Sequence, residues 1–212
     1  MELFSEELIH YLENSCEPEN ELLKHINRET HLKVSMPRML SGHYQGKLLS
    51  MISKLINPER ILEIGTFTGY ATLCLAEGLR ENGRIYTIDI NLELEDMVRS
   101  NFKKSELDSK IMYQIGDAKV IIPTLNEIFD LVFIDADKKN NATYYDMVID
   151  KVRSGGLILV DNVLWSGKVL DEGVSDQKTS FISQFNERIS SDQRVEKLIL
   201  PVRDGLYLIR KK

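Results

Sequence analysis

The feature that most constrains this chain is the alternation of short apolar runs with segments of helical periodicity. Parallel strands need a long crossover, usually a helix, so the alternation predicts parallel strands with helices on both faces. The end of the chain differs, because the runs VEKLILPV and GLYLIRK are joined only by RDG, which suits a hairpin. We therefore predict an α/β fold with a doubly wound, mostly parallel seven-stranded sheet and an antiparallel last strand. The five earlier strands are expected at 60–65, 84–90, 110–117, 129–135 and 155–162.

The first quarter of the chain has a different pattern. Residues 1–57 are more polar, and SEELIHYLEN, ENELLKHINRET and GHYQGKLLSMISKLI each have helical periodicity. We expect three helices that form an N-terminal helical cap and lid packed on the sheet, followed by an α/β core over 58–212. No long linker rich in Pro, Gly or Ser interrupts the 212 residues, so we expect a single domain over 1–212.

Composition argues against several classes of protein. The 27 Lys and Arg residues and 33 Asp and Glu residues give a net charge of -6, and the basic residues are scattered, which argues against a nucleic-acid partner. Cys16 and Cys74 have no metal-binding spacing and are expected to be free thiols, which favours a cytoplasmic protein. The N-terminus has no leader pattern, and no apolar segment approaches the ~18 residues of a membrane span, so no membrane association is expected.

The residues that close the first three strands suit a nucleotide-like cofactor, because ligands of open α/β sheets bind at the carboxyl ends of the strands. Phe67 stands where a dinucleotide site needs glycine, so it would obstruct pyrophosphate and pack against a smaller, cationic cofactor. Asp89 closes the second strand and is placed to accept hydrogen bonds from ribose hydroxyls, with a helix cap as the alternative. Residues 116–118 close the third strand and either line an adenine or form an ordinary turn.

Oxygen ligands close the fourth and fifth strands. Asp135 ends one strand, and Asp161 with Asn162 end the next, so three oxygen donors are expected on one edge of the sheet. Such hard donors suit Mg²⁺, Mn²⁺ or Ca²⁺ and leave coordination positions open, whereas the alternative is a solvated turn. Lys138 is expected either to accept a proton during catalysis or only to neutralise the carboxylates. Asp137 is expected to face the cofactor or to cap a helix.

Together these motifs resemble one family over nearly the whole chain. LEIGTFTGYATLCLA, IDI, FIDADK and DNVLWSG are similar to the motifs of the cation-dependent, S-adenosylmethionine-dependent O-methyltransferases, the family of caffeoyl-CoA and catechol O-methyltransferases. The resemblance implies a class I, Rossmann-like methyltransferase fold, with Asp135 and Lys138 at the reacting oxygen and Trp165 and Asp204 beside the acceptor. With the residues above, it gives an expected cofactor-binding set of Ser41, Glu63, Gly65, Thr66, Phe67, Ala71, Asp89, Gly116, Asp117, Ala118 and Asp135.

The resemblance also implies a reaction, in which the methyl group of S-adenosylmethionine passes to a hydroxyl of a catechol-like vicinal diol held by a divalent cation. A free phenol has a pKa of ~10, so a chelating cation would supply the phenolate that attacks the methyl group. A homodimer is implied as well. Two alternatives are methylation of a hydroxylated uridine in tRNA and a nucleotide-binding module without enzymatic activity. Because the extra N-terminal segment of plant enzymes is not present, compact catechols are expected to be preferred over CoA esters. The family commonly has a small hydroxyl residue where this chain has Ala71.

Overall fold

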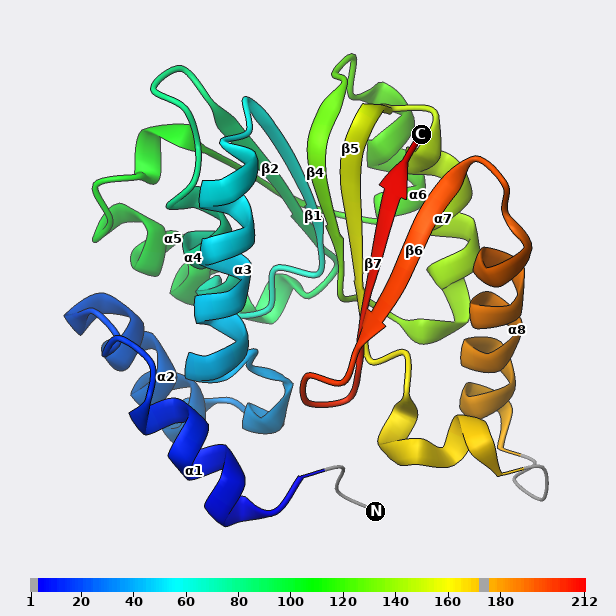
Figure 1. The fold of residues 1–212 in the computed structure, drawn as a ribbon. Helices are drawn as coiled ribbons and strands as arrows, with labels where there is room; N and C mark the ends of the chain where they lie inside the picture. The colour runs from blue at the N-terminus through cyan, green and yellow to red at the C-terminus, as the bar shows by residue number, and fades with distance from the viewer. Residues whose placement is uncertain (1–3, 172–175) are drawn as a thin grey trace.

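Seven strands form one sheet in the structure, a computed structural model that describes residues 4–171 and 176–212. Their order is β3-β2-β1-β4-β5-β7-β6 (Figure 1). Strands β1 to β5 pair in parallel, and β7 pairs antiparallel with both β5 and β6, so the predicted sheet is confirmed. The strands are β1 (Arg60–Ile64), β2 (Arg84–Asp89), β3 (Ile111–Ile115), β4 (Phe129–Ile134), β5 (Val152–Asp161), β6 (Val195–Leu200) and β7 (Leu206–Lys211).

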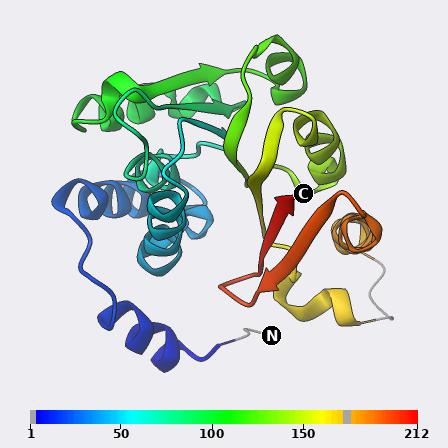
Figure 2. The same ribbon diagram turned by 45° about the horizontal axis from the view of Figure 1, so that its top comes forward.

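Helices cover both faces of the sheet, as Figure 2 shows from a second direction. One face carries α2 (Glu21–Lys33), α3 (Gly42–Ile56), α4 (Tyr70–Ala76) and α5 (Glu95–Lys103), and the other carries α6 (Ala118–Ile121), α7 (Asn141–Ile149) and α8 (Gln177–Ser191). Short 3₁₀ turns connect these elements: η1 (Pro37–Met39), η2 (Leu92–Leu94), η3 (Asp108–Lys110), η4 (Ile122–Thr124), η5 (Lys138–Asn140) and η6 (Trp165–Leu170). Within the described residues, no helix combines the length and apolar character that crossing a membrane requires.

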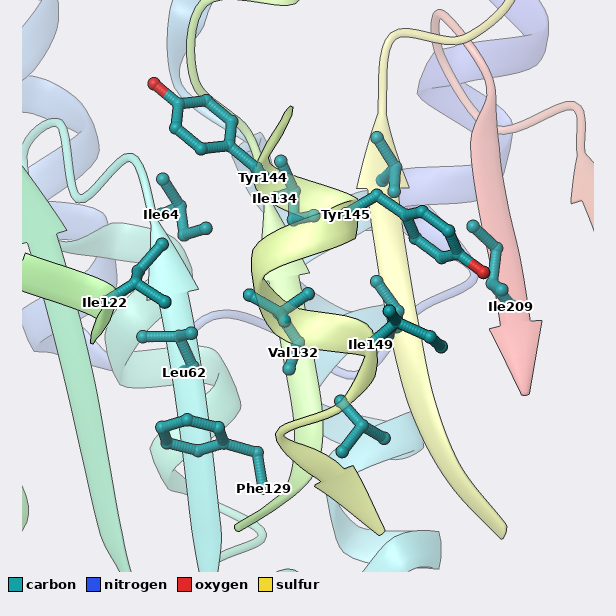
Figure 3. Close-up of a cluster of buried hydrophobic side chains, with 14 of the residues drawn as sticks. Leu62, Ile64, Ile122, Phe129, Val132, Ile134, Tyr144, Tyr145, Ile149 and Ile209 are labelled. Atoms are coloured by element: carbon teal, nitrogen blue, oxygen red, sulfur yellow. The ribbon is translucent and has the colours of Figure 1, made fainter. Parts of the chain in front are cut away.

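The interior on the α7 side explains why β4 is almost uninterruptedly apolar. Val132 and Ile134 of β4 belong to the same buried cluster as Tyr145 and Ile149 of α7 (Figure 3), and all four side chains are at most 2% exposed. Burial of such a side chain stabilises the fold by roughly 1.5 to 3 kcal/mol. Because β4 lies centrally in the sheet and is covered on both faces, it is buried on both sides. This packing fixes the position of its carboxyl end.

The N-terminal helices differ in how they pack. Leu23 of α2 and Leu49 of α3 are buried in the same cluster as Ile61 of β1, as expected for a cap. The first helix, α1 (Glu6–Asn14), buries none of its residues from 7 to 14, and Leu8 and Tyr11 on it are 41% and 68% exposed. The prediction that the cap packs on the sheet therefore applies to α2 and α3 but not to α1, whose apolar side chains stay largely in solvent.

Candidate active site

Parallel pairing brings the carboxyl ends of β1, β4 and β5 to one edge of the sheet. Ile64 of β1 is in register with Ile134 of β4, which is in register with Val160 of β5. The next residues along each strand are Gly65, Asp135 and Asp161, so these three lie side by side. Gly65 has a φ of 104°, and a Cβ there would lie 2.1 Å from the backbone oxygen of Asp135. Only glycine fits this close contact, which joins the cofactor side and the metal side of the expected site.

Asp89 at the end of β2 holds the turn after β1 in place. Its carboxylate accepts hydrogen bonds from the backbone N–H of Phe67 at 2.7 Å and of Asn91 at 2.8 Å. Asn91, rather than Asp89, caps the following turn by accepting a hydrogen bond from the N–H of Glu93 at 3.0 Å. The helix-cap alternative for Asp89 is therefore wrong. The carboxylate is only partly buried, so its remaining lone pairs are open to further hydrogen-bond donors.

Glu63 of β1 is completely buried among hydroxyl groups. It accepts hydrogen bonds from Thr72 and from Thr87, the latter at 2.5 Å, while its Oε1 has no hydrogen-bond partner within the described part of the chain. Burial raises the pKa of Glu63 to about 8, against the opposing effect of the two threonine hydroxyls. Thr66 is also buried, and its hydroxyl shares a 2.6 Å hydrogen bond with that of Thr87. Thr66 therefore has mainly its backbone to offer a cofactor, and neighbouring Ala71 is buried at 7% exposure.

The end of β3 has the form of an ordinary strand-to-helix turn. Gly116 donates its N–H to the carbonyl of Asp89 at 2.8 Å, and Asp117 caps α6 by accepting a hydrogen bond from the N–H of Lys119 at 2.8 Å. Ala118 is 6% exposed. The turn alternative is thus realised for the Asp117 side chain, while the backbone of residues 116–118 lies beside Asp89 and remains able to border an adenine.

The carboxylates of Asp135 and Asp161 lie at the ends of neighbouring strands. Asp161 is 4% exposed, and its Oδ1 has no hydrogen-bond partner among the described residues. Burial and then the nearby charge of Asp135 raise the pKa of Asp161 to about 6. Lys138 donates a hydrogen bond to Asp135 at 3.0 Å, and its side chain is only 12% exposed. A buried, unpartnered carboxylate oxygen beside a second carboxylate fits a divalent cation, with Asn162 next in the chain as a neutral oxygen donor.

No group of three or more His, Cys, Asp and Glu side chains arranged to hold a metal ion occurs among the described residues. The predicted metal ligands are two carboxylates and one amide, so they contain fewer than three side chains of these four types. Asp137 faces away from them, because its carboxylate accepts hydrogen bonds from Tyr144 and from Asn140, both at 2.6 Å. Asp137 therefore holds the start of α7 through two side chains, but its carboxylate makes no capping hydrogen bond to a backbone N–H.

On the acceptor side, Asp204 lies beside the loop that contains Trp165. The carboxylate of Asp204 accepts a hydrogen bond from the N–H of Ser166, and its backbone oxygen accepts one from Leu164 at 2.9 Å. Asp204 thus anchors the loop that follows β5. Trp165 is partly exposed, with a φ of 49° in the left-handed region. A cavity of about 450 Å³ borders Lys138 between η5 and α8, and its lining includes Lys139, Phe181 and Arg188.

Two residues that the sequence analysis did not identify also face this region. Gln45 of α3 is completely buried, and Arg203 in the β6–β7 turn reaches its Oε1 at 3.4 Å. Both act to lower the pKa of Asp161. Ser41, 6% exposed, lies just before α3 and also accepts a hydrogen bond from Arg203. A lone glutamine in a helix and an arginine in a hairpin turn carry no sequence pattern that points to a site.

Comparisons with known proteins relate this chain to one family of enzymes. A family model described as O-methyltransferase matches residues 12–212. A caffeoyl-CoA O-methyltransferase of Medicago sativa is 35% identical over 226 residues, which cover 99% of this chain and 90% of the relative. The O-methyltransferase TomG of Streptomyces achromogenes, solved with S-adenosylmethionine, has a TM-score of 0.89 at 28% identity, covering 97% of this chain and 96% of that one. An O-methyltransferase of Bacillus cereus, solved with S-adenosylhomocysteine, has a TM-score of 0.89 at 29% identity, covering 97% of both chains.

Proposed function

This chain belongs to the S-adenosylmethionine-dependent O-methyltransferase family, and we propose that its acceptor is a catechol-like aromatic diol held by a divalent cation at Asp135, Asp161 and Asn162. The unpartnered, buried Oδ1 of Asp161 beside Asp135 is the observation that carries the proposal. Family membership makes the chain an enzyme, so the alternative of a nucleotide-binding module without enzymatic activity is wrong.

The proposed cation site explains why two carboxylates lie together in a buried position. A bound Mg²⁺, with Mn²⁺ or Ca²⁺ as alternatives, would neutralise them, lower the pKa of a chelated diol and hold its two oxygens in place. Asn162 would complete the set as a neutral ligand. Lys138, which donates to Asp135 at 3.0 Å, would hold that carboxylate in position as an ammonium and, in its neutral amine form, take the proton of the reacting hydroxyl.

For the cofactor, we propose that the first three strand ends hold S-adenosylmethionine. Asp89 would accept hydrogen bonds from the ribose hydroxyls, because its carboxylate is already oriented by Phe67 and Asn91. The ring of Phe67 would pack against the cofactor, and the backbone of residues 116–118 would border the adenine. The remaining proposed cofactor contacts come from Ser41, Glu63, Gly65, Thr66, Ala71 and Asp135.

For the acceptor, Trp165 would form a stacking wall against the aromatic ring, and Asp204 would position the loop that carries it. The relatives named as caffeoyl-CoA O-methyltransferases support a small phenolic acceptor.

We also propose that the enzyme is a homodimer that forms through the face carrying α3. On α3, Met51 and Leu55 are 54% and 84% exposed, and on β6 Leu198 is 58% exposed. Leu198 is in register with Leu208 of β7, which packs against the core cluster of the same face. An exposed apolar surface of this kind is typical of a protein interface.

Removal of the cation tests the proposed reaction. With a simple catechol as acceptor, EDTA should abolish methyl transfer while the affinity for S-adenosylmethionine, measured by calorimetry, stays largely unchanged. Added Mg²⁺ or Mn²⁺ should restore transfer. Asp161→Ala should resemble the chelated enzyme, whereas the control Asp150→Ala, at an exposed position after α7, should retain activity. Full activity in EDTA, after elemental analysis shows that no metal remains, would contradict the proposal.

The role of Lys138 needs a separate test, because the sequence leaves two roles open. If Lys138 accepts the proton, Lys138→Ala should lose a factor of about 10² to 10⁴ in kcat, and a higher pH should recover part of it. Lys138→Arg keeps the positive charge but cannot accept a proton near neutral pH, so it should be nearly as slow. Activity close to wild type in Lys138→Arg would show that the lysine only neutralises the carboxylates.

A further inference from the structure

Arg203 joins two segments that lie 162 to 165 positions apart in the sequence. It is in the turn between β6 and β7, and its guanidinium donates to the backbone carbonyls of Leu40, at 2.6 Å, and of Ser41. It also donates to the carbonyl of Arg38 at 3.1 Å. These three carbonyls belong to the lid segment, defined as residues 36–41, which leads into α3. Figure 1 shows the β6–β7 turn beside this end of α3.

The lid segment has little else to hold it in place. Its own backbone hydrogen bonds are local, from Met39 to Met36 at 3.1 Å and from Leu40 to Pro37 at 3.0 Å. Met36 and Met39 are 45% and 52% exposed, so apolar burial fixes the segment mainly at its end, near Leu40. Hydrogen bonds from a charged donor are stronger than those between neutral groups. The guanidinium is therefore the main long-range polar anchor of the lid segment in the described chain.

The backbone at Arg203 adopts a conformation that is unfavourable for a residue with a side chain. Its φ of 49° lies in the left-handed region, which costs a residue other than glycine roughly 1 to 2 kcal/mol. A glycine would relieve that strain but has no side chain to bond the lid segment. Strained backbone that persists in a fold is a reason to look for function at that position.

The same turn also holds the acceptor side of the site. Asp204, the next residue, accepts hydrogen bonds from Leu164 and Ser166 in the loop that carries Trp165, and the carbonyl of Gly205 accepts one from Val163 at 3.2 Å. Adjacent residues of this one short turn therefore form hydrogen bonds with the lid segment and with the loop that carries Trp165.

We propose that Arg203 is a positioning residue that fixes the lid segment, and with it Ser41, over the cofactor. The proposal rests on the proposed function in one respect, which is that Ser41 borders S-adenosylmethionine. Arg203 touches no reacting group in this role. Its contribution is to remove the freedom of the lid segment before the cofactor binds, which lowers the ordering cost of binding.

Calorimetry with S-adenosylmethionine, without acceptor or added cation, tests the proposal separately from the proposed reaction. Arg203→Ala and Arg203→Gly should each weaken cofactor affinity by about tenfold or more, the factor that corresponds to the loss of a charge-assisted hydrogen bond. Arg203→Lys should recover part of the loss, because lysine keeps the charge but not the forked geometry. Arg210→Ala is the matched control, since Arg210 lies on the same hairpin and pairs with Glu196 at 2.7 Å.

Two further measurements separate positioning from simple loss of fold. In Arg203→Ala, hydrogen exchange at the Met39 and Leu40 amides should become faster, while exchange in the central strands stays as in the wild type. In steady state, the KM for S-adenosylmethionine should rise while kcat at saturating cofactor changes by less than about threefold, because saturating cofactor restores the ordered lid segment by mass action. Unchanged cofactor affinity in both variants would overturn the proposal. Wild-type affinity in Arg203→Gly with a loss only in Arg203→Ala would also overturn it, because the backbone of the turn would then be what matters.

Discussion

The buried carboxyl of Glu63 makes the stability of the enzyme depend on pH in a predictable direction. Its side chain is fully buried, and burial raises its pKa to about 8 from the ordinary glutamate value of 4.5. Between these two values the folded protein keeps the proton and the unfolded chain does not. The folded state then binds more protons, so the free energy of unfolding falls as the pH rises through this window, and levels off above pH 8.

The size of the effect follows from the width of the window. One pKa unit corresponds to 1.36 kcal/mol, so a carboxyl with these two pKa values destabilises the fold by about 2 kcal/mol between pH 6 and pH 8. Glu63→Gln removes this titration and keeps the shape of the protonated side chain. Its oxygen can accept from Thr72 and Thr87, as the carboxyl does. Between pH 6 and pH 8, the free energy of unfolding of the variant should therefore fall by about 2 kcal/mol less than that of the wild type.

Urea unfolding of the cofactor-free protein at pH 6 and pH 8, followed by circular dichroism, measures this difference. The comparison between the two proteins cancels the titration of every other group that they share. Glu106→Gln is the control, since Glu106 is exposed and the substitution should leave the pH dependence as in the wild type. Identical pH dependence in the wild type and Glu63→Gln would refute the reasoning, and would mean that Glu63 is already ionised at pH 6.

Three further predictions concern the cofactor, the acceptor and the packing of α3. Asp89→Ala should weaken S-adenosylmethionine binding by about 1.5 to 3 kcal/mol in calorimetry, the range for hydrogen bonds to a charged group, and unchanged affinity with the fold intact would remove the ribose assignment. Trp165→Ala should raise the acceptor KM by about two- to tenfold without changing cofactor affinity, as expected for the loss of an aromatic contact of about 0.5 to 1.5 kcal/mol. Gly78→Ala should lower the free energy of unfolding by about 1 to 3 kcal/mol, because the new Cβ would lie 2.2 Å from the carbonyl carbon of Ser53, and a stability equal to wild type would show that α3 shifts freely.

Much of the fold follows from local patterns. The apolar runs and the RDG connection predict the strands and the antiparallel end, because strand periodicity and connection length are properties of neighbouring residues. The closeness of Gly65, Asp135 and Asp161 follows as well, since parallel strands end at a common edge. The sequence therefore determined which residues meet at that edge, and the resemblance gave them roles.

Other features needed the tertiary structure, because they depend on partners that are distant in the chain. The resemblance implied a place beside the acceptor for Asp204, and the fold adds that its carboxylate anchors the loop at Ser166. The hydroxyl of Thr66 is occupied by Thr87, which no local pattern indicates. The exposed apolar face of α1 is another case, since helical periodicity predicts a helix but not whether anything covers it.

Arg203 is the clearest example of a residue whose contacts could not be predicted from the sequence. Its hydrogen bonds to Leu40 and Ser41 span 163 and 162 positions in the sequence. From the sequence alone, a lone arginine in a hairpin turn is expected to be a solvated side chain. Nothing in the neighbouring sequence indicates a contact with the segment before α3. The bonds form only because strand order places β7 next to β5, and because α3 packs on the adjacent part of the same sheet face. Local sequence thus determined the strands and their end residues, while the assembled sheet decided which side chains hold the site together.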